Sequence, residues 1–254
     1  MKLDGKTVLI TGASSGIGRE LARQLTEKNC RLVLIARREE RLQELLKTLP
    51  GKSEHVYFIC DVANQEQVTA VCRKLHEDGI TIDIMVLNAG VSRYFLVKDF
   101  SVEDFRYTFA VNFFGVLYFI EQLLPAMLQR NAGTIAVVSS LTGYRGMPKA
   151  ASYAASKAAL SNFIESLRID LWKTGIKCVL ISPGFVKSEM TGDSSSPKPF
   201  FMDTDKAVQR IIRGLENEKT EIHFPRRLSW LAKFSRLFPD KFYARLMYNK
   251  RKAE

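Results

Sequence analysis

Short apolar segments alternate with longer amphipathic segments along most of the chain. Runs rich in β-branched and other apolar residues predict buried strands at residues 7–11, 31–36, 56–60, 82–88, 133–140 and 176–182, with a short seventh strand at 221–224. The stretches between them, such as the long segment 102–129 and the segment 153–173, carry apolar residues at helical spacing. Strands that are almost continuously apolar are buried on both faces, so the pattern predicts an α/β fold with a parallel sheet between two layers of helices.

Length and composition fit a protein with one large domain. The chain has 254 residues, of which 46% are hydrophobic and 26% charged, a balance typical of soluble domains. Four scattered cysteines are expected to be free thiols of a reducing compartment. The N-terminal residues run directly into the first predicted strand and leave no room for a signal peptide, and the apolar run 113–120 is too short to span a bilayer. These features predict a cytoplasmic protein.

A glycine-rich sequence, TGASSGIG at residues 11–18, lies between the first predicted strand and the first predicted helix. Glycines at such a place allow a tight turn and let a pyrophosphate approach the N-terminus of the helix. The candidate cofactor-binding residues are Gly12, Ser14, Ser15, Gly16, Ile17 and Gly18. Because the spacing differs from G-x-G-x-x-G, the motif indicates a dinucleotide site only in this context, and a plain turn is the alternative.

The end of the second predicted strand bears on the choice of dinucleotide. An acidic residue here binds the ribose 2′-hydroxyl of NAD, whereas an arginine accommodates the 2′-phosphate of NADP. This chain has Ala36 followed by Arg37 and Arg38. We therefore expect NADP(H) in preference to NAD(H), the alternative being that both arginines belong to a solvated loop.

Tyr153 and Lys157 lie four residues apart in the segment SYAASKAAL, and so on one side of a predicted helix. An ammonium about 4 Å from the phenol would supply on the order of 4 kcal/mol at an effective dielectric near 20. That is roughly what lowering a phenol pKa by about three units requires. The pair is predicted to be a tuned proton donor or acceptor, with an ordinary surface pair as the alternative.

Together with further short motifs, these residues give the chain between about residues 5 and 224 a resemblance to the short-chain dehydrogenases/reductases. The motifs are TGASSGIG, DV (61–62), NAG (88–90), Asn112 in VNFFG, VSS ending at Ser140, YAASK (153–157) and PG (183–184). The resemblance implies a single-domain, Rossmann-type, doubly wound sheet of seven parallel strands. It also implies a homodimer or homotetramer, formed through the helices at about 102–129 and 152–173.

The resemblance assigns a catalytic role to four residues. Tyr153 would give a proton to a carbonyl oxygen, and Ser140 would hydrogen-bond the same oxygen. Lys157 would hold the nicotinamide ribose and favour the tyrosinate, and Asn112 would anchor a water that supplies protons. A purely structural Asn112 is the alternative, and alternation along the strand places Ser139 on the other face from Ser140.

Further cofactor contacts are implied in the same way. Asp61 would contact the adenine, with Val62 packed beside it. Asn88, Ala89 and Gly90 would line the ribose and steady the central strands. Contacts to the nicotinamide carboxamide fall to Pro183, Gly184 and Val186, and Ser188 stands where the family often has threonine. No metal site is expected, because Cys72 and His76 have no second ligand pair nearby and fit a surface thiol and imidazole.

The segment 188–203 is polar, interrupted by proline and then aromatic. The resemblance places this region over the substrate, so a mobile lid is expected, with Phe200, Phe201 and Met202 in contact with it. An apolar lid points to a hydrophobic carbonyl compound, such as a lipid-like ketone, a steroid, a retinoid or an aromatic aldehyde. The alternative is that these side chains anchor the loop to the domain.

The C-terminal segment 225–254 stands apart by its charge. It contains nine Lys or Arg and two acids, and so carries +7 of the net charge of +11. Its apolar residues recur at helical spacing until Pro239, which predicts two short amphipathic helices. Contact with a membrane surface and packing over the substrate pocket or a partner subunit both stay open, and nucleic-acid binding is not expected.

The sequence thus predicts a catalytic domain at 1–224 with a basic amphipathic extension at 225–254. The predicted function is NADPH-dependent, reversible reduction of a hydrophobic ketone or aldehyde to an alcohol. The alternatives are an NADP(H)-binding sensor and a lipid-associated protein at a membrane surface, each with little turnover. Every catalytic group that the resemblance requires is present, which favours the enzyme.

Overall fold

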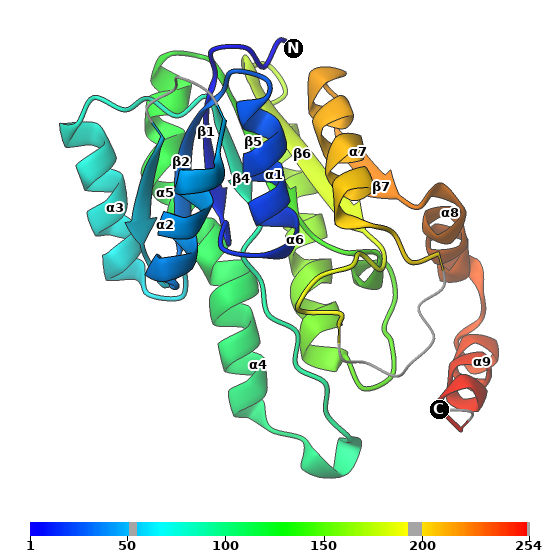
Figure 1. Cartoon of the computed structure of the whole chain (residues 1–254). Helices are drawn as coiled ribbons and strands as arrows, with labels where there is room; N and C mark the ends of the chain where they lie inside the picture. The colour runs from blue at the N-terminus through cyan, green and yellow to red at the C-terminus, as the bar shows by residue number, and fades with distance from the viewer. Residues whose placement is uncertain (51–54, 193–199, 253–254) are drawn as a thin grey trace.

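The computed structural model describes residues 1–50, 55–192 and 200–252 (Figure 1). Within this part of the chain, seven strands form one sheet in the order β3-β2-β1-β4-β5-β6-β7, and every pair of neighbours is parallel. The strands are β1 (Thr7–Thr11), β2 (Arg31–Ala36), β3 (Val56–Ile59), β4 (Ile84–Leu87), β5 (Gly133–Val138), β6 (Ile176–Pro183) and β7 (Glu221–Phe224). The seven-stranded, doubly wound sheet expected from the sequence is confirmed.

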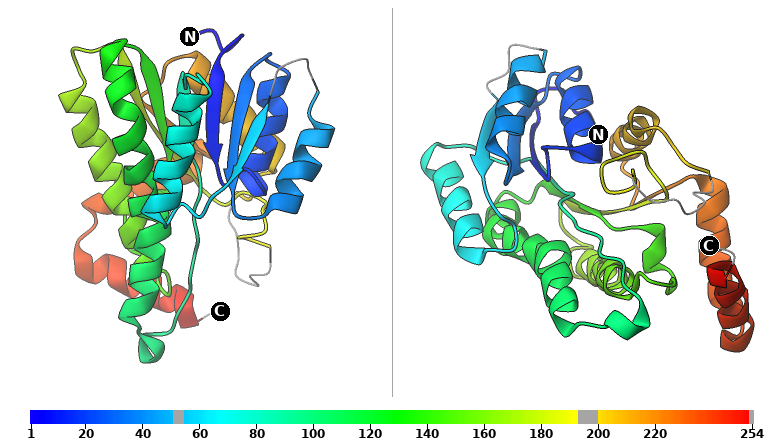
Figure 2. Two further views of the ribbon diagram at one scale, coloured as in Figure 1. Left: turned by 90° about the vertical axis from the view of Figure 1, so that its left-hand side faces the viewer. Right: turned by 60° about the horizontal axis from the view of Figure 1, so that its bottom comes forward.

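Helices cover both faces of the sheet (Figures 1 and 2). One layer contains α1 (Gly16–Thr26), α2 (Glu39–Thr48) and α7 (Thr204–Glu216), and the other contains α3 (Gln65–Glu77), α5 (Gly115–Gln129) and α6 (Ala151–Asp170). Successive residues of β1 alternate between the layers: Val8 and Ile10 belong to the first core, and Leu9 belongs to the second. The strands β1, β2, β4 and β5 are buried along nearly their whole length, which explains their unbroken apolar sequences, whereas β3 at the edge of the sheet is only partly buried.

The predicted long helix at 102–129 is continuous but not regular. It consists of α4 (Val102–Phe109), a π-helical turn (Ala110–Phe114) and α5. An 18-residue window in it has a mean hydropathy of 1.5 and is 39% buried, so by length and composition this helix could cross a membrane, contrary to the expectation from the run 113–120. Val116, Phe119 and Ile120 nevertheless pack into the core beneath the sheet, as expected for a core helix of a globular domain.

The C-terminal segment forms two helices, as predicted. The first, α8 (Arg226–Phe234), packs beside β7 and is followed by a 3₁₀ turn, η4 (Ser235–Leu237). The second, α9 (Asp240–Lys252), begins directly after Pro239. Figure 1 shows α9 at the lower end of the molecule, the end at which the strands β1, β4 and β5 finish.

Candidate active site

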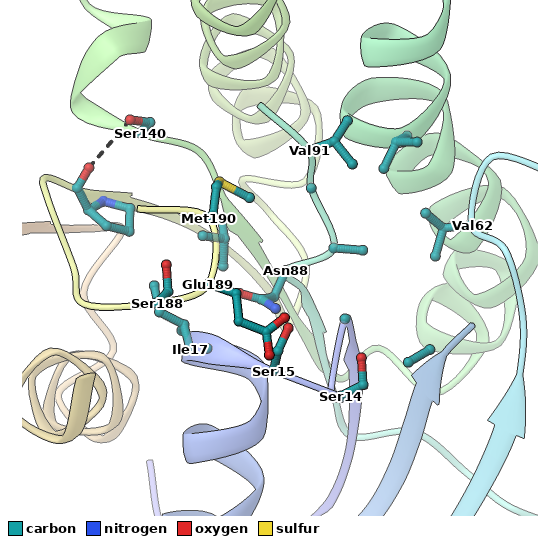
Figure 3. A pocket seen from close by; sticks show the side chains of 18 of the residues that line it. Ser14, Ser15, Ile17, Val62, Asn88, Val91, Ser140, Ser188, Glu189 and Met190 are labelled. Atoms are coloured by element: carbon teal, nitrogen blue, oxygen red, sulfur yellow. Dashed lines mark hydrogen bonds between the residues drawn. The ribbon is translucent and has the colours of Figure 1, made fainter. Parts of the chain in front are cut away.

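A pocket lies where the carboxyl ends of the strands meet (Figure 3). Nearly all the predicted site residues line it: Gly12, Ser14, Ser15, Gly16, Ile17, Arg37, Arg38, Asp61, Val62, Asn88, Ala89, Gly90, Ser140, Tyr153, Lys157, Pro183, Gly184, Val186 and Ser188. Gly18 and Asn112 do not line the pocket but contact residues that do: Gly18 packs against Asn88, and Asn112 bonds to Val91. Parallel strands bring these distant motifs together, because all their carboxyl ends face one edge of the sheet.

The glycine loop packs too closely against the end of β4 to carry larger side chains. Gly12 has φ +69°, and a Cβ there would lie 3.0 Å from Asn88 Nδ2. A Cβ on Gly18 would lie 2.7 Å from the same nitrogen and still closer to the Gly12 carbonyl oxygen. Asn88 Nδ2 donates to Thr11 O at 3.0 Å, while Thr11 Oγ1 accepts from Asn88 N at 3.0 Å. This joins the ends of β1 and β4 directly beneath the loop.

Two arginines from the end of β2 flank the same side of the pocket. Arg38 donates to the hydroxyl oxygens of Ser14 at 3.0 Å and Ser15 at 2.8 Å. Arg37 pairs with Asp61 at 3.6 Å, and its pKa is raised mainly by a hydrogen bond with Tyr107. The structure therefore places one guanidinium over the glycine loop and the other beside Asp61.

Glu189 is a pocket residue that the sequence did not point to. It follows β6, and its carboxylate pairs with Arg38 at 3.0 Å and also with Arg41. Hydrogen bonds from Arg38 and then Arg41 lower the pKa of Glu189. Figure 3 shows Glu189 next to Met190, another lining residue absent from the predicted set. The partners of Glu189 lie about 150 residues earlier in the chain, so no local pattern could have linked them.

Tyr153 and Lys157 face each other, as their spacing predicts, but the electrostatics differ from the expectation. Lys157 Nζ lies 5.7 Å from the centre of the Tyr153 ring and donates to Val138 O at 2.7 Å. Burial raises the pKa of Tyr153 to about 12, although a hydrogen bond with Ser140 acts in the lowering direction. Burial also lowers the pKa of Lys157 to about 8. The predicted lowering of the phenol pKa is thus wrong for the protein alone, because desolvation outweighs the ammonium at this distance.

The two neighbouring serines after β5 take different roles. Ser139 Oγ donates to Lys157 O at 2.8 Å and lies 3.0 Å from Ser161 Oγ, so its hydroxyl is engaged by α6. Ser140 Oγ accepts from Thr142 N at 3.2 Å and lies 3.5 Å from Pro183 O, a pair drawn in Figure 3. Only the Ser140 hydroxyl is also placed to hydrogen-bond Tyr153.

Asn112 is fully buried in the π-helical turn. Its Oδ1 accepts from Val91 N at 2.8 Å, and its Nδ2 donates to Val91 O and to Ser156 Oγ, both at 3.0 Å. These bonds use both amide hydrogens and fix the segment after β4 against α6. The structural role considered for Asn112 is therefore present, and the water-anchoring role remains a proposal.

The thiols do not belong to a metal centre among the residues that the structure describes. No group of three or more His, Cys, Asp or Glu side chains there could hold a metal ion. The four cysteines are free and buried. Cys72 was expected at the surface, but it packs into the core formed with α3 and α5, where burial raises its pKa to about 12.

Comparisons with known proteins agree with this geometry. A family model described as "short chain dehydrogenase" matches residues 6–199. An uncharacterized oxidoreductase of Myxococcus xanthus is 36% identical over 239 residues, which cover 94% of each chain. The 3-oxoacyl-[acyl-carrier-protein] reductase FabG of Rickettsia conorii is 35% identical over 212 residues, covering 84% of this chain and 83% of the relative.

Solved structures share the fold. A short-chain dehydrogenase/reductase from Burkholderia phymatum in complex with NAD aligns with a TM-score of 0.83 and 24% identity, covering 92% of this chain and 93% of the other. An alcohol dehydrogenase from Thermococcus sibiricus complexed with 5-hydroxy-NADP aligns with a TM-score of 0.78 and 26% identity, covering 87% of this chain and 96% of the other.

Proposed function

The chain belongs to the short-chain dehydrogenase family and is an NAD(P)-dependent oxidoreductase, and from this premise we propose that it reduces a hydrophobic ketone or aldehyde with NADPH. The reverse reaction, oxidation of the alcohol, would use the same groups. The observation that carries the proposal is the meeting of Ser140, Tyr153 and Lys157 beside the glycine loop in one pocket.

The residues of the pocket fit a dinucleotide. Gly12 and Gly16 line the pocket, and the loop opens into the N-terminus of α1, where backbone N–H groups attract a pyrophosphate. Asp61, Val62, Pro183, Gly184 and Val186 all line the pocket. On this proposal the adenine would lie beside the first two and the nicotinamide beside the other three. When bound, a nicotinamide coenzyme supplies or accepts the hydride.

The protein's own part in the reaction is to place a carbonyl oxygen and to provide its proton. Tyr153 remains protonated at neutral pH, because its pKa lies near 12, and so it can donate to the oxygen as negative charge develops there. Ser140 can donate a hydrogen bond to the same oxygen. Lys157, held by Val138 O, directs its ammonium toward the ring of Tyr153 and stabilises the tyrosinate that the transfer leaves.

We favour NADPH over NADH because of the arginines at the end of β2. Arg38 is already aimed at the hydroxyls of Ser14 and Ser15, and its guanidinium forms a planar fork suited to a phosphate. A 2′-phosphate would replace the Glu189 carboxylate as the anionic partner of Arg38. A relative in complex with NAD and another with an NADP derivative show that the fold accepts either coenzyme.

The substrate side of the pocket supports an apolar substrate. Val91 and Met190 line it, and Tyr94 lies close enough to Tyr153 to influence its pKa.

The proposed lid is described only in part, because residues 193–199 lie outside the described residues. Of its aromatic end, Phe200 is exposed, whereas Met202 pairs with Val186 and packs against the core, as the anchoring alternative requires.

An oligomer and a cytoplasmic location belong to the same proposal. Phe114 and Leu128 are exposed large apolar side chains on the helix 102–129, which fits a surface that a second copy would cover.

The competing function is an NADP(H)-binding sensor with little turnover. Turnover itself separates the two, because a sensor would bind NADPH without oxidising it.

The test is a screen of NADPH oxidation over varied hydrophobic ketones and aldehydes, with NADH in parallel. We expect turnover with NADPH, and a rate about 10²- to 10⁴-fold lower for Tyr153→Phe, since a general acid contributes that much. Nucleotide fluorescence should show that the variant still binds NADPH. Equal rates of NADPH oxidation for the wild type and Tyr153→Phe would refute the role of Tyr153. Binding of NADPH without turnover of any carbonyl compound would favour the sensor.

A further inference from the structure

The C-terminal helices present their large apolar side chains to solvent. We call this set the tail surface: Trp230, Leu231, Phe234, Leu237, Phe242 and Leu246, which are between 41% and 73% exposed. The side of α8 that faces the domain carries the buried Ser229 and the half-buried Leu228, which lies against Gly184. The open alternative, in which the main apolar face covers the substrate pocket, therefore does not match the orientation of these helices.

Several bonds hold the tail surface in a fixed orientation, among them Lys233 with Glu221 at 2.6 Å, Arg236 with Tyr144 O at 2.7 Å and those of Arg145. Arg145, in the loop between Ser140 and Tyr153, donates to the carbonyl oxygens of Ser235 and Phe238. Its guanidinium also pairs with Asp240 at 3.0 Å and lies 4.0 Å from the centre of the Tyr243 ring. The hydroxyl of Tyr243 returns a hydrogen bond to Gly146 O at 2.8 Å. The exposed apolar face is thus a rigid part of the pocket end rather than a loose terminus.

Positive charge accompanies this apolar face. Arg226, Arg227, Lys241 and Arg245 are exposed on α8 and α9. The acidic side chain of α9, Asp240, is neutralised from within the fold by Arg145. Basic residues interleaved with Trp, Phe and Leu on short helices are typical of segments that lie in the interface of an anionic membrane.

A second apolar projection lies at the same end of the molecule. In the segment from Tyr94 to Val102, the side chains of Tyr94, Val97, Phe100 and Val102 are 58–74% exposed. Figures 1 and 2 place this segment, at the tip of α4, at the same end as α9. The carboxyl ends of the strands, where the pocket residues gather, face that end too. Two separate apolar projections beside one opening exceed the scattered exposed apolar residues of an ordinary surface.

We propose that this end of the molecule docks on an anionic membrane surface, through the tail surface with its cations and through the segment Tyr94–Val102. The apolar side chains enter the headgroup region, and Lys241 and Arg245 meet lipid phosphates. The pocket then opens toward the lipid. On the proposed function, this geometry lets a hydrophobic carbonyl substrate reach Tyr153 from the bilayer without crossing water.

Flotation of the full-length protein with lipid vesicles tests the charge component. The protein should float with vesicles of phosphatidylcholine and phosphatidylglycerol and much less with phosphatidylcholine alone. The double variant Lys241→Gln with Arg245→Gln should lower the partition coefficient by about 30-fold, since each cation near such a surface contributes about fivefold. Lys173→Gln with Lys177→Gln is the matched control, because both lysines are exposed next to the start of β6, at the opposite end of the sheet.

The apolar component has its own matched pair. Phe242→Ser with Leu246→Ser should reduce flotation at least tenfold, because two apolar side chains that the membrane would bury are lost. Ile169→Ser with Trp172→Ser removes two side chains of equal or greater exposure at the end of α6, away from the pocket, and should leave flotation unchanged. Circular dichroism should show that all four variants are folded.

Absence of flotation with anionic vesicles would overturn the proposal, as would equal losses in the tail variants and their controls. Sedimentation showing that Phe242→Ser with Leu246→Ser converts an oligomer to a monomer, without vesicle binding, would assign the tail surface to a second copy instead. Turnover of a water-soluble aldehyde without vesicles tests the reductase separately. An inactive protein that floats would refute the function alone, and an active one that does not float would refute the docking alone.

Discussion

Raising the pH should weaken NADPH binding by removing the proton of Lys157 well before Tyr153 ionises. Burial lowers the pKa of Lys157 to about 8 and raises that of Tyr153 to about 12. Below about pH 8 the ammonium is present and can make the contact with the nicotinamide ribose that the proposed function gives it. Above that pH the charged fraction falls tenfold per unit, whereas the phenol keeps its proton.

The size of the effect follows from the bond that is lost. A hydrogen bond from a charged donor contributes about 1.5–3 kcal/mol, which is roughly 10- to 150-fold in Kd. The Kd for NADPH should therefore rise about tenfold per pH unit above about pH 8 and level off within about one to two units, when the contact contributes nothing further.

The Kd for NADPH can be measured by fluorescence titration on the wild type and on Tyr153→Phe. A range from about pH 6 to about pH 10.5 covers the flat part of the profile below the pKa of Lys157 and the rise above it. The variant has no phenol and should show the same midpoint if Lys157 is the titrating group. A flat profile in Tyr153→Phe would show that Tyr153 titrates instead, and would refute the assignment. Circular dichroism over the same range excludes unfolding as the cause.

Three further changes have defined outcomes. Gly18→Ala should cost about 1–3 kcal/mol of stability, or roughly 2–12 °C in Tm, and abolish nucleotide binding, because the new Cβ would press on the Gly12 carbonyl. Gly146→Ala is the control, because a Cβ there would have no neighbour within 4 Å, and it should melt at the temperature of the wild type. Equal losses of stability in the two variants would contradict the packing argument. Arg38→Gln should raise the Kd for NADPH by about 10- to 150-fold and leave that for NADH within about twofold, whereas a common loss would show a general role. Arg145→Ala should speed cleavage of the C-terminal helices in limited proteolysis, and Arg145→Lys should not restore protection, because an ammonium lacks the planar fork.

The sequence predicted the sheet and most of the pocket because both depend on local patterns. Apolar runs of strand length mark the sheet, and the motifs that follow them must meet at its carboxyl edge once the strands are parallel. The glycine loop and the pair of Tyr153 and Lys157 were found from such patterns without knowledge of any contact, whereas Ser140 came from the resemblance to the family. The pairing of Glu189 with Arg38 and Arg41 could not be found, because it depends on where the segment after β6 passes over the end of β2.

The pair of Tyr153 and Lys157 shows that helical spacing predicts which side chains are neighbours but not how deeply they are buried. The spacing of Tyr153 and Lys157 correctly placed them on one side of α6, since helical geometry alone determines that. It could not show that Lys157 Nζ is engaged by Val138 O, nor how far desolvation acts on each group. The sign of the phenol's pKa shift was wrong for this reason: the Coulomb attraction was counted and the burial was not.

The C-terminal helices show the same limit more sharply. Their periodicity predicted two amphipathic helices, and Pro239 separates them as expected. Periodicity defines an apolar face but does not say whether that face turns inward. Here tertiary bonds decide it: Arg145 bonds Ser235, Phe238 and Asp240, and Lys233 pairs with Glu221. With the helices held in this way, Trp230, Phe234 and Phe242 face outward. A rigid apolar face kept in solvent beside exposed cations favours aggregation unless another surface covers it. The bonds that fix this orientation are therefore best explained by the proposed contact with an anionic membrane.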